Sequence, residues 1–241
     1  MRLLVTRPEP DASREAEALA ARGHEAVLAP LLKIEFAPDV PLDLAGVQAL
    51  IVTSRNALRA LATRHELEHA RKLPLFAVGE ATARAARELG FAILVRAPGT
   101  AAALPELIGG KLDPIRGPVL HLAGENLAFD LKTALEAKGF TLHQPVLYRA
   151  VPAEQLPARA LSLLKAGELD GAILLSPRTA RTLAALIDKH GAVTQVRRLV
   201  CYCLSQAVAE VLAPLGFRVR VASKPREEDV LALVDSEAAS S

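Results

Sequence analysis

Short apolar runs alternate along the chain with longer stretches in which Ala, Leu and Arg recur at helical spacing. The apolar runs are continuous, which is typical of strands covered on both faces. The expected strands are Arg2–Thr6, Glu25–Glu35 with Pro30 inside it, Ala49–Thr53, Leu75–Val78, Ala92–Val95, Val119–Ala123, Gly171–Leu175, Arg198–Leu204 and Arg218–Val221. Asp11–Arg22 predicts a helix that Gly23 closes. Strands that alternate with helices predict parallel α/β sheets.

The same pattern occurs twice in the chain. Both copies contain Leu-Gly-Phe, at 89–91 and at 215–217. The segments that align are Leu75–Val95 with Cys201–Val221, Ala49–Leu61 with Gly171–Leu183, and Arg2–Gly23 with Pro118–Gly139. Three similar segments in the same order predict two copies of one α/β unit, roughly 1–115 and 116–241. The alternative is the chance similarity that strand-Gly-helix units give to any α/β protein.

The repeat leaves open which pieces share a sheet. Each copy could fold by itself, or the opening β-α-β of one copy could join the remainder of the other. Two extended segments, Ala29–Phe36 and Gln144–Val151, are long enough to be strands that link two domains.

Composition excludes several classes of protein. The 241 residues carry 29 basic and 27 acidic side chains, and 51% are hydrophobic but only 3% aromatic. Such a chain is too apolar to be disordered, and too poor in basic and aromatic residues for a typical nucleic-acid or sugar binder. A membrane-spanning helix needs about 20 apolar residues, and the uncharged runs of this chain are shorter. The first residues also lack the apolar region of a signal peptide. Cys201 and Cys203, two apart in an expected strand, indicate core thiols, so we expect a reduced, cytoplasmic protein.

Candidate chemistry lies where strands run into helices. Ligands of open parallel sheets bind beyond the carboxyl ends of the strands, where free N–H groups of helix N-termini attract anions. The candidate substrate-binding residues in these turns are Arg7, Ser54, Arg55, Asn56, Gly79, Glu80, Gly124, Ser176, Pro177, Arg178 and Ser205. Three of the turns carry an arginine, whose planar fork suits carboxylate or phosphate, so we expect a polyanionic small molecule. For the three serines the alternative is simple capping of the following helix.

Metal and cofactor motifs are weak or absent. Residues 65–69 read His-Glu-Leu-Glu-His, the string of many zinc proteases, but the surrounding charges indicate a solvated helix end. The sequence contains no glycine-rich dinucleotide loop, phosphate loop or nucleophile elbow. We therefore expect no metal and no cofactor.

Tyr148 is one of only two tyrosines and lies in the second extended segment. A tyrosine in a linker would face a cleft between domains, where its hydroxyl could donate a proton to a leaving oxygen. The alternative is a ring that packs against a domain edge.

Four segments resemble the uroporphyrinogen-III synthase family: LVTRPEP at 4–10, APLLKI at 29–34, VTSRNA at 52–57 and AVGEATA at 77–83. The resemblance covers nearly the whole chain in order. It implies two similar doubly wound parallel-sheet α/β domains joined by two β-strand linkers. One domain would combine 1–35 with 152–241 and the other would span 36–147, with linkers at about 30–37 and 144–151.

The resemblance also implies the reaction. The family closes linear hydroxymethylbilane to uroporphyrinogen III, with inversion of the last pyrrole (ring D) and loss of water, in tetrapyrrole biosynthesis, without metal or cofactor. Loss of the hydroxyl gives a reactive azafulvene, which is followed by spiro attack, fragmentation and reclosure. By position, Tyr148 matches the linker tyrosine proposed to assist departure of the hydroxyl. The positions that match turns lining the cleft are Ser54, Gly79, Thr82 and Ser176.

Two positions depart from the family pattern. Val208 stands where threonine is frequent, and the turn Ala123–Asn126 lacks an arginine often found shortly after it. The expected partners are hydroxymethylbilane and a hydroxymethylbilane synthase that hands it over, and we expect a monomer that binds neither nucleic acid nor membrane. The alternative function is a non-enzymatic two-domain binding protein or sensor for an anionic metabolite.

Overall fold

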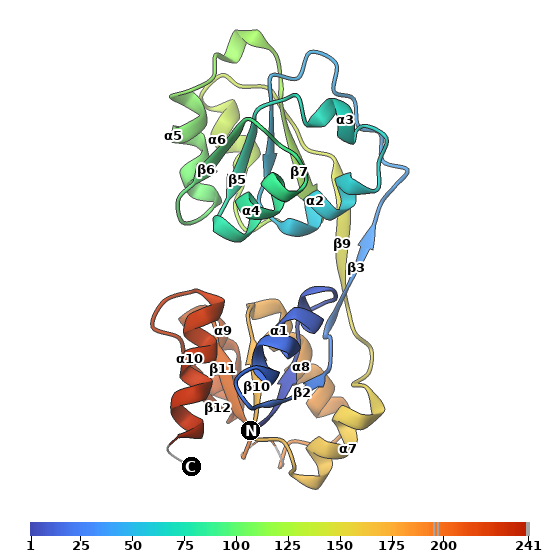
Figure 1. Ribbon diagram of the computed structural model, residues 1–241, viewed down its shortest axis with the longest axis vertical. Coiled ribbons are helices and arrows are strands. Elements are labelled where there is room, and N and C mark those ends of the chain that lie inside the picture. Colours follow the sequence, from blue (N-terminus) through green and yellow to red (C-terminus); the bar gives the residue numbers. More distant parts are fainter. Residues whose placement is uncertain (195, 197, 240–241) are drawn as a thin grey trace. The chain divides into compact units, whose positions relative to one another are not determined.

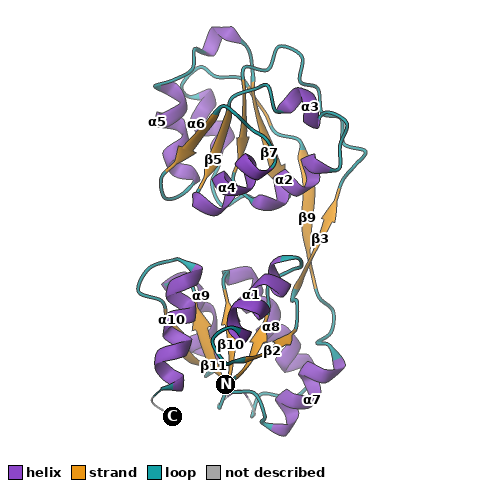
Figure 2. Ribbon diagram, in the orientation of Figure 1, coloured by secondary structure: helices purple, strands orange, loops and turns teal. Residues whose placement is uncertain are grey.

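The computed structural model describes residues 1–194, 196 and 198–239 of the chain (Figure 1). The chain divides into two compact units. Met1–Lys33 and Val151–Ser241 form the first, here called the discontinuous unit, and Ile34–Ala150 forms the second, the central unit. Each contains a largely parallel sheet flanked by helices (Figure 2), which confirms the α/β class.

Both chain segments of the discontinuous unit contribute strands to its sheet. The strands are β1 (Arg2–Val5), β2 (Glu25–Leu28), β10 (Gly171–Leu174), β11 (Val200–Cys203) and β12 (Arg218–Val221), in the order β12-β11-β10-β1-β2. Every pairing between these strands is parallel. Because β1 lies between β10 and β2, the N-terminal strand is an interior strand of a sheet that takes three of its five strands from the C-terminal segment.

Helices cover both faces of this sheet. They are α1 (Asp11–Ala20), α7 (Ala158–Ala166), α8 (Pro177–Lys189), α9 (Gln206–Leu212), the 3₁₀ turn η4 (Ala213–Leu215) and α10 (Glu227–Ala238). Leu4 and Cys201 belong to a core cluster with α8, whereas Tyr202 belongs to the opposite cluster with α1 and α10. Neighbouring strand residues thus face opposite cores, which explains the continuous apolar runs. Both cysteines are buried free thiols, as predicted.

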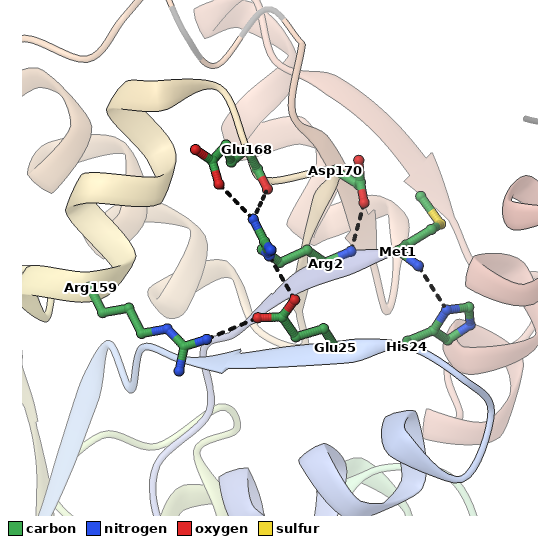
Figure 3. Close-up of polar contacts among 7 residues, drawn as sticks. All are labelled: Met1, Arg2, His24, Glu25, Arg159, Glu168 and Asp170. Atoms are coloured by element: carbon green, nitrogen blue, oxygen red, sulfur yellow. Dashed lines mark hydrogen bonds and ion pairs between the residues drawn. The ribbon is translucent and has the colours of Figure 1, made fainter.

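Charged side chains join the two segments of the discontinuous unit at the amino ends of its strands (Figure 3). Arg2 Nε and Nη1 each lie 2.8 Å from a carboxylate, those of Glu25 and Glu168, and the Arg2 N–H donates to Asp170 at 2.6 Å. Arg159 of α7 reaches the same Glu25 at 2.9 Å. Each exposed pair adds little stability alone, but together they hold β1 beside β2 and the segment before β10.

The sheet of the central unit has the order β3-β9-β7-β4-β5-β6, with β8 paired to β7. Its strands are β3 (Leu32–Phe36), β4 (Ala49–Val52), β5 (Leu75–Val78), β6 (Leu94–Ala97), β7 (Val119–Gly124), β8 (Leu142–His143) and β9 (Val146–Pro152). The boundary between the two units falls within β3 and within β9. The N–H of Ala37 donates to the Leu147 carbonyl at 2.8 Å and so ties these two strands together.

Helices also cover both faces of the central sheet. They are α2 (Arg55–Ala62), α3 (Leu67–Ala70), α4 (Glu80–Glu88), α5 (Leu104–Gly109) and α6 (Leu131–Glu136), with 3₁₀ turns η1 (Ala101–Ala103) and η2 (Pro114–Arg116). Leu50 and Leu120 pack with α2 and α4, whereas Ile51 and Val119 pack with α5 and α6.

Most of the expected strands are present, with shifted ends. Glu25–Glu35 is the exception, because it forms two strands, β2 and β3, that lie in different sheets. Pro30 lies between them and has no N–H to continue a strand ladder. The largest shift concerns β6, expected at Ala92–Val95 and found at Leu94–Ala97, because its parallel register aligns Leu94 with Leu75 and leaves Ile93 52% exposed. The expected helix Asp11–Arg22 ends at Ala20, and Gly23 has the positive φ of 79° of the turn that follows.

Candidate functional site

The strand order brings three strand-to-helix turns to one edge of each unit. In the central unit β7, β4 and β5 are neighbours, and in the discontinuous unit β1, β10 and β11 are neighbours. The central unit carries the predicted residues Ser54, Arg55, Asn56, Gly79, Glu80, Thr82, Gly124 and Tyr148. The discontinuous unit carries Arg7, Ser176, Pro177, Arg178 and Ser205.

Tyr148 of β9 lies against the end of β7. It pairs with Gly124, and the N–H of Glu125 donates to its carbonyl at 3.0 Å. The side chain is half-buried beside the core cluster of α2 and α4. Burial raises the pKa of the phenol above its ordinary value of 10.0, and a hydrogen bond with the Ser54 side chain opposes this rise. Tyr148 is therefore a neutral phenol at physiological pH, able to donate a proton.

Two of the three candidate serines cap a helix. Ser54 has extended backbone angles, and its Oγ accepts from the Asn56 N–H at 3.2 Å. Ser176 Oγ accepts from the Thr179 N–H at 3.1 Å and lies 2.7 Å from Thr179 Oγ1. Ser205 has a similar backbone conformation, but its side chain makes no capping bond to the described first turn of α9. The capping interpretation therefore holds for Ser54 and Ser176.

The turn after β5 combines a special backbone with a buried hydroxyl. Gly79 has φ 78° and ψ 157°, a region that only glycine adopts without strain, and α4 begins directly after it. Thr82 is only 7% exposed in the first turn of α4. Glu80 is exposed and lies 3.4 Å from both Arg87 and Arg96.

The three candidate arginines have different surroundings. Arg7 is held by three carboxylates, with nitrogen–oxygen distances of 2.7 Å to Glu227, 3.6 Å to Glu15 and 3.8 Å to Asp11. Arg55 and Arg178 are half-buried in the first turns of α2 and α8. Next to Arg55, the Asn56 amide oxygen accepts from Arg59 at 2.7 Å.

Two buried ionisable groups, Glu15 and His121, lie near these turns and were not predicted from the sequence. Glu15 is 1% exposed, and neither of its carboxylate oxygens has a hydrogen-bond partner among the described residues. Burial raises its pKa to about 7, although the Arg7 charge opposes this. His121 of β7 is 2% exposed, and burial lowers its pKa to about 4. The spacing of Arg7, Asp11 and Glu15 by four residues could have indicated that they meet on one face.

His121 lies between two polar side chains of the central unit. Its Nδ1 is 2.7 Å from Gln144 Nε2, and its Nε2 is 3.4 Å from Thr53 Oγ1. A ring whose Nδ1 accepts from the amide carries its proton on Nε2 and so remains neutral.

The zinc-protease string forms no metal centre in the structure. His65 has a 93% exposed side chain, and Glu66 is engaged by Arg64 at 3.0 Å. Among the described residues there is no cluster of three or more His, Cys, Asp or Glu side chains that could hold a metal ion. The same part of the chain contains no helix long and apolar enough to cross a membrane.

Two hollows lie near the amino ends of the strands of the central sheet. The first hollow has a volume of about 350 Å³, and its lining includes Val47, Pro118 and Gln144. The second has a volume of about 560 Å³, and its lining includes Gln48 and Pro74. These residues precede or begin strands, so the hollows lie away from the carboxyl ends that carry Tyr148.

A model of the uroporphyrinogen-III synthase HemD family matches residues 13–232 of the chain. The chain belongs to this family. The match confirms the resemblance seen in four sequence segments, the expected enzyme class and a tetrapyrrole substrate. No functionally curated protein matches the chain.

Two solved structures of the same family share the fold. Uroporphyrinogen-III synthetase from Helicobacter pylori 26695 is 21% identical, with a TM-score of 0.69 and 98% of both chains covered. A mutant uroporphyrinogen III synthase from the extremely thermophilic bacterium Thermus thermophilus is 19% identical, with a TM-score of 0.59 over 99% of this chain and 98% of that one. At these identities the likeness supports the fold, and the family match supports the activity.

Proposed function

We propose that the protein closes linear hydroxymethylbilane to uroporphyrinogen III, with inversion of ring D and loss of water. The family match over residues 13–232 carries this proposal. The substrate bears an acetate and a propionate on each pyrrole, so recognition calls for several anion-binding groups. The first turns of α2 and α8, each at the positive end of a helix dipole and each with an arginine, supply groups of this kind.

Tyr148 is the proposed proton donor. The step breaks the bond between carbon and the terminal hydroxyl while electron density from the pyrrole nitrogen forms the azafulvene. The phenol proton goes to the departing oxygen, which leaves as water, and the pyrrole N–H proton restores the phenol. A raised pKa keeps the phenol protonated and ready at neutral pH. The later steps use the intrinsic reactivity of the azafulvene, so the protein mainly orients the chain ends and excludes water.

The same proposal includes the internal duplication. β1, β2, β10, β11 and β12 correspond in order and sheet position to β7, β8, β4, β5 and β6. Ser176 and Ser54 then occupy equivalent caps, and Val208 occupies the place of Thr82. β3 and β9 would be the linkers between two copies, each copy a domain.

We further propose a cytoplasmic monomer that receives its substrate from a hydroxymethylbilane synthase and uses neither metal nor cofactor. The near balance of 29 basic and 27 acidic residues supports a small-molecule partner rather than nucleic acid.

The test is to supply freshly generated hydroxymethylbilane and separate the oxidised products by chromatography. The type III isomer should exceed the type I isomer that forms spontaneously. If only type I appears while the substrate binds, the chain is a binding protein for the tetrapyrrole and the proposed reaction is wrong.

A further inference from the structure

We propose that Gly124 and Ser54 are positioning residues for the Tyr148 phenol, Gly124 by the absence of a side chain and Ser54 by its hydroxyl. Both positions were expected from the sequence to bind substrate directly. The catalytic meaning of this inference rests on the proposed function, whereas the geometry itself does not.

The backbone on either side of Tyr148 is fixed by β7. Ala123 pairs with Val146 but Gly124 pairs with Tyr148, so the register shifts by one residue between these two positions. The N–H groups of Ala123 and Glu125 donate to the carbonyls of Pro145 and Tyr148, each at 3.0 Å. Such irregularities re-aim side chains, and here the neighbouring Leu147 and Tyr148 both pack against the cluster of α2 and α4.

A glycine is required at position 124 because the Tyr148 ring lies very close to it, and not because of its backbone angles. Its φ lies outside the left-handed region, unlike that of Gly79. A Cβ at Gly124 would lie 2.5 Å from Tyr148 Cζ, 2.7 Å from its hydroxyl oxygen and 2.8 Å from Cε2. These atoms are the reacting end of the ring, which β7 and β9 hold in place. Any side chain at position 124 would therefore displace the phenol itself.

Ser54 is oriented before it meets the phenol. Its Oγ accepts from the Asn56 N–H at 3.2 Å and is also hydrogen-bonded to the Tyr148 side chain, and in the proposed arrangement the Ser54 hydroxyl donates to the phenol oxygen. A phenol that accepts from Ser54 keeps its own proton for another acceptor. When that proton leaves, the Ser54 hydroxyl and the N-terminus of α2 stabilise the negative charge that develops on the phenol oxygen.

Absorbance titration tests the contact with Ser54 without any substrate. The chain has two Tyr and no Trp, so a Tyr202→Phe background leaves Tyr148 as the one phenol that ionises. In that background Ser54→Ala should raise the Tyr148 pKa, measured by rapid pH jumps before alkaline unfolding. Ser176→Ala is the matched control, because Ser176 caps an equivalent helix and pairs with Thr179. An unchanged Tyr148 pKa in Ser54→Ala would overturn the assignment.

Kinetics then separate positioning from substrate binding. Ser54→Ala should lower kcat about tenfold with little change in KM, and should have no further effect in a Tyr148→Phe background. A raised KM that persists in that background would show that Ser54 binds substrate directly. If the wild-type chain forms no uroporphyrinogen III, the proposed function fails, while the titration still decides the geometry.

Gly124→Ala should lower kcat about 100-fold, because a misplacement of about 1 Å costs that much. Should the variant fold poorly, stability supplies the test. The added methyl group should lower the urea midpoint in the wild-type chain and not in Tyr148→Ala, where the ring is gone. Gly109→Ala is the control, since a Cβ there meets only Lys138 at 3.6 Å. Equal losses in both backgrounds would overturn the role of Gly124.

Discussion

The two units share a strand order, yet they hold different polar groups at corresponding places. The turn after β1 contains Arg7 among three carboxylates, whereas β7 ends at Gly124, which lies against the Tyr148 ring. In the discontinuous unit the Arg7 charge is paired with the protein's own carboxylates. In the central unit the Tyr148 phenol is the proposed proton donor. Two sheets of similar strand order thus supply comparable positions, while the side chains decide which unit carries the chemistry.

The buried ionisable groups of the two units differ in the same way. Glu15 in the discontinuous unit has a raised pKa of about 7, and His121 in the central unit has a lowered pKa of about 4. Both groups are neutral over part of the acidic range because burial disfavours their charged forms. The folded chain resists protonation of His121 and ionisation of Glu15. Burial of His121 therefore lowers stability as pH falls, and burial of Glu15 lowers stability as pH rises.

The largest expected effect is the loss of turnover when Tyr148 of the central unit is changed. Tyr148→Phe should lower kcat about 100-fold, because it removes the proposed general acid while the ring still packs on Gly124. Product formation by chromatography measures the rate, and far-UV circular dichroism checks the fold. Tyr202→Phe is the control, since Tyr202 is fully buried in the core of the other unit. Equal turnover in wild type and Tyr148→Phe would remove the phenol from the mechanism.

The corresponding change in the discontinuous unit should affect stability. Arg7→Ala removes the cation that Glu15, Glu227 and Asp11 share, and loss of one partner from such a cluster costs about 3 to 5 kcal/mol. Urea denaturation monitored by circular dichroism measures the free energy of unfolding. Arg14→Ala serves as the control, because the Arg14 side chain is 62% exposed and 3.8 Å from Asp11. A loss no larger than in Arg14→Ala would mean that the Arg7 cluster contributes little.

The pH dependence should distinguish the two buried groups. The His121 pKa is about 4 in the folded chain against an ordinary 6.5, so stability is lost as pH falls from 6.5 to 4. The Glu15 pKa is about 7 against an ordinary 4.5, so stability is lost as pH rises from 4.5 to 7. Each effect is at most about 3.5 kcal/mol, because each pH unit of the interval contributes about 1.4 kcal/mol.

Unfolding free energies between pH 4 and 8 measure this for Glu15→Gln and a His121→Asn variant. The two intervals overlap and the two effects have opposite signs, so they largely cancel in the wild-type chain. Glu15→Gln should therefore leave only the loss of stability as pH falls from 6.5 to 4, and His121→Asn only the loss as pH rises from 4.5 to 7. Substitution of the exposed His65 should leave the wild-type pH profile unchanged. Identical pH profiles in Glu15→Gln and wild type would show that Glu15 is ionised in the folded chain.

The smallest effect concerns the caps. Ser176→Ala should cost about 1 kcal/mol, because it removes a bond to the Thr179 N–H, whereas Ser205→Ala should cost almost nothing. Urea midpoints of the two variants provide the comparison. Equal costs would mean that the capping bond adds no net stability.

Much of the fold followed from local pattern. The bounds of β5 and β12 were predicted to the residue, because continuous apolar runs next to amphipathic helices are a local signal. The ends of β6 and α1 were shifted, because register with a neighbouring strand and the geometry of a closing turn decide where an element stops. The candidate turns could be located for the same reason, since they follow strands.

The sequence by itself determined the class of fold, the turns at the strand ends and the family resemblance, whereas the structure decided which of the three serines cap a helix. Only the tertiary structure decided which groups meet: Arg7 with Glu227, His121 with Gln144, and Gly124 with Tyr148. Each of these pairs joins distant parts of the chain. The burial that sets their pKa values arises only when those segments pack together, because desolvation depends on all surrounding atoms and not on sequence neighbours.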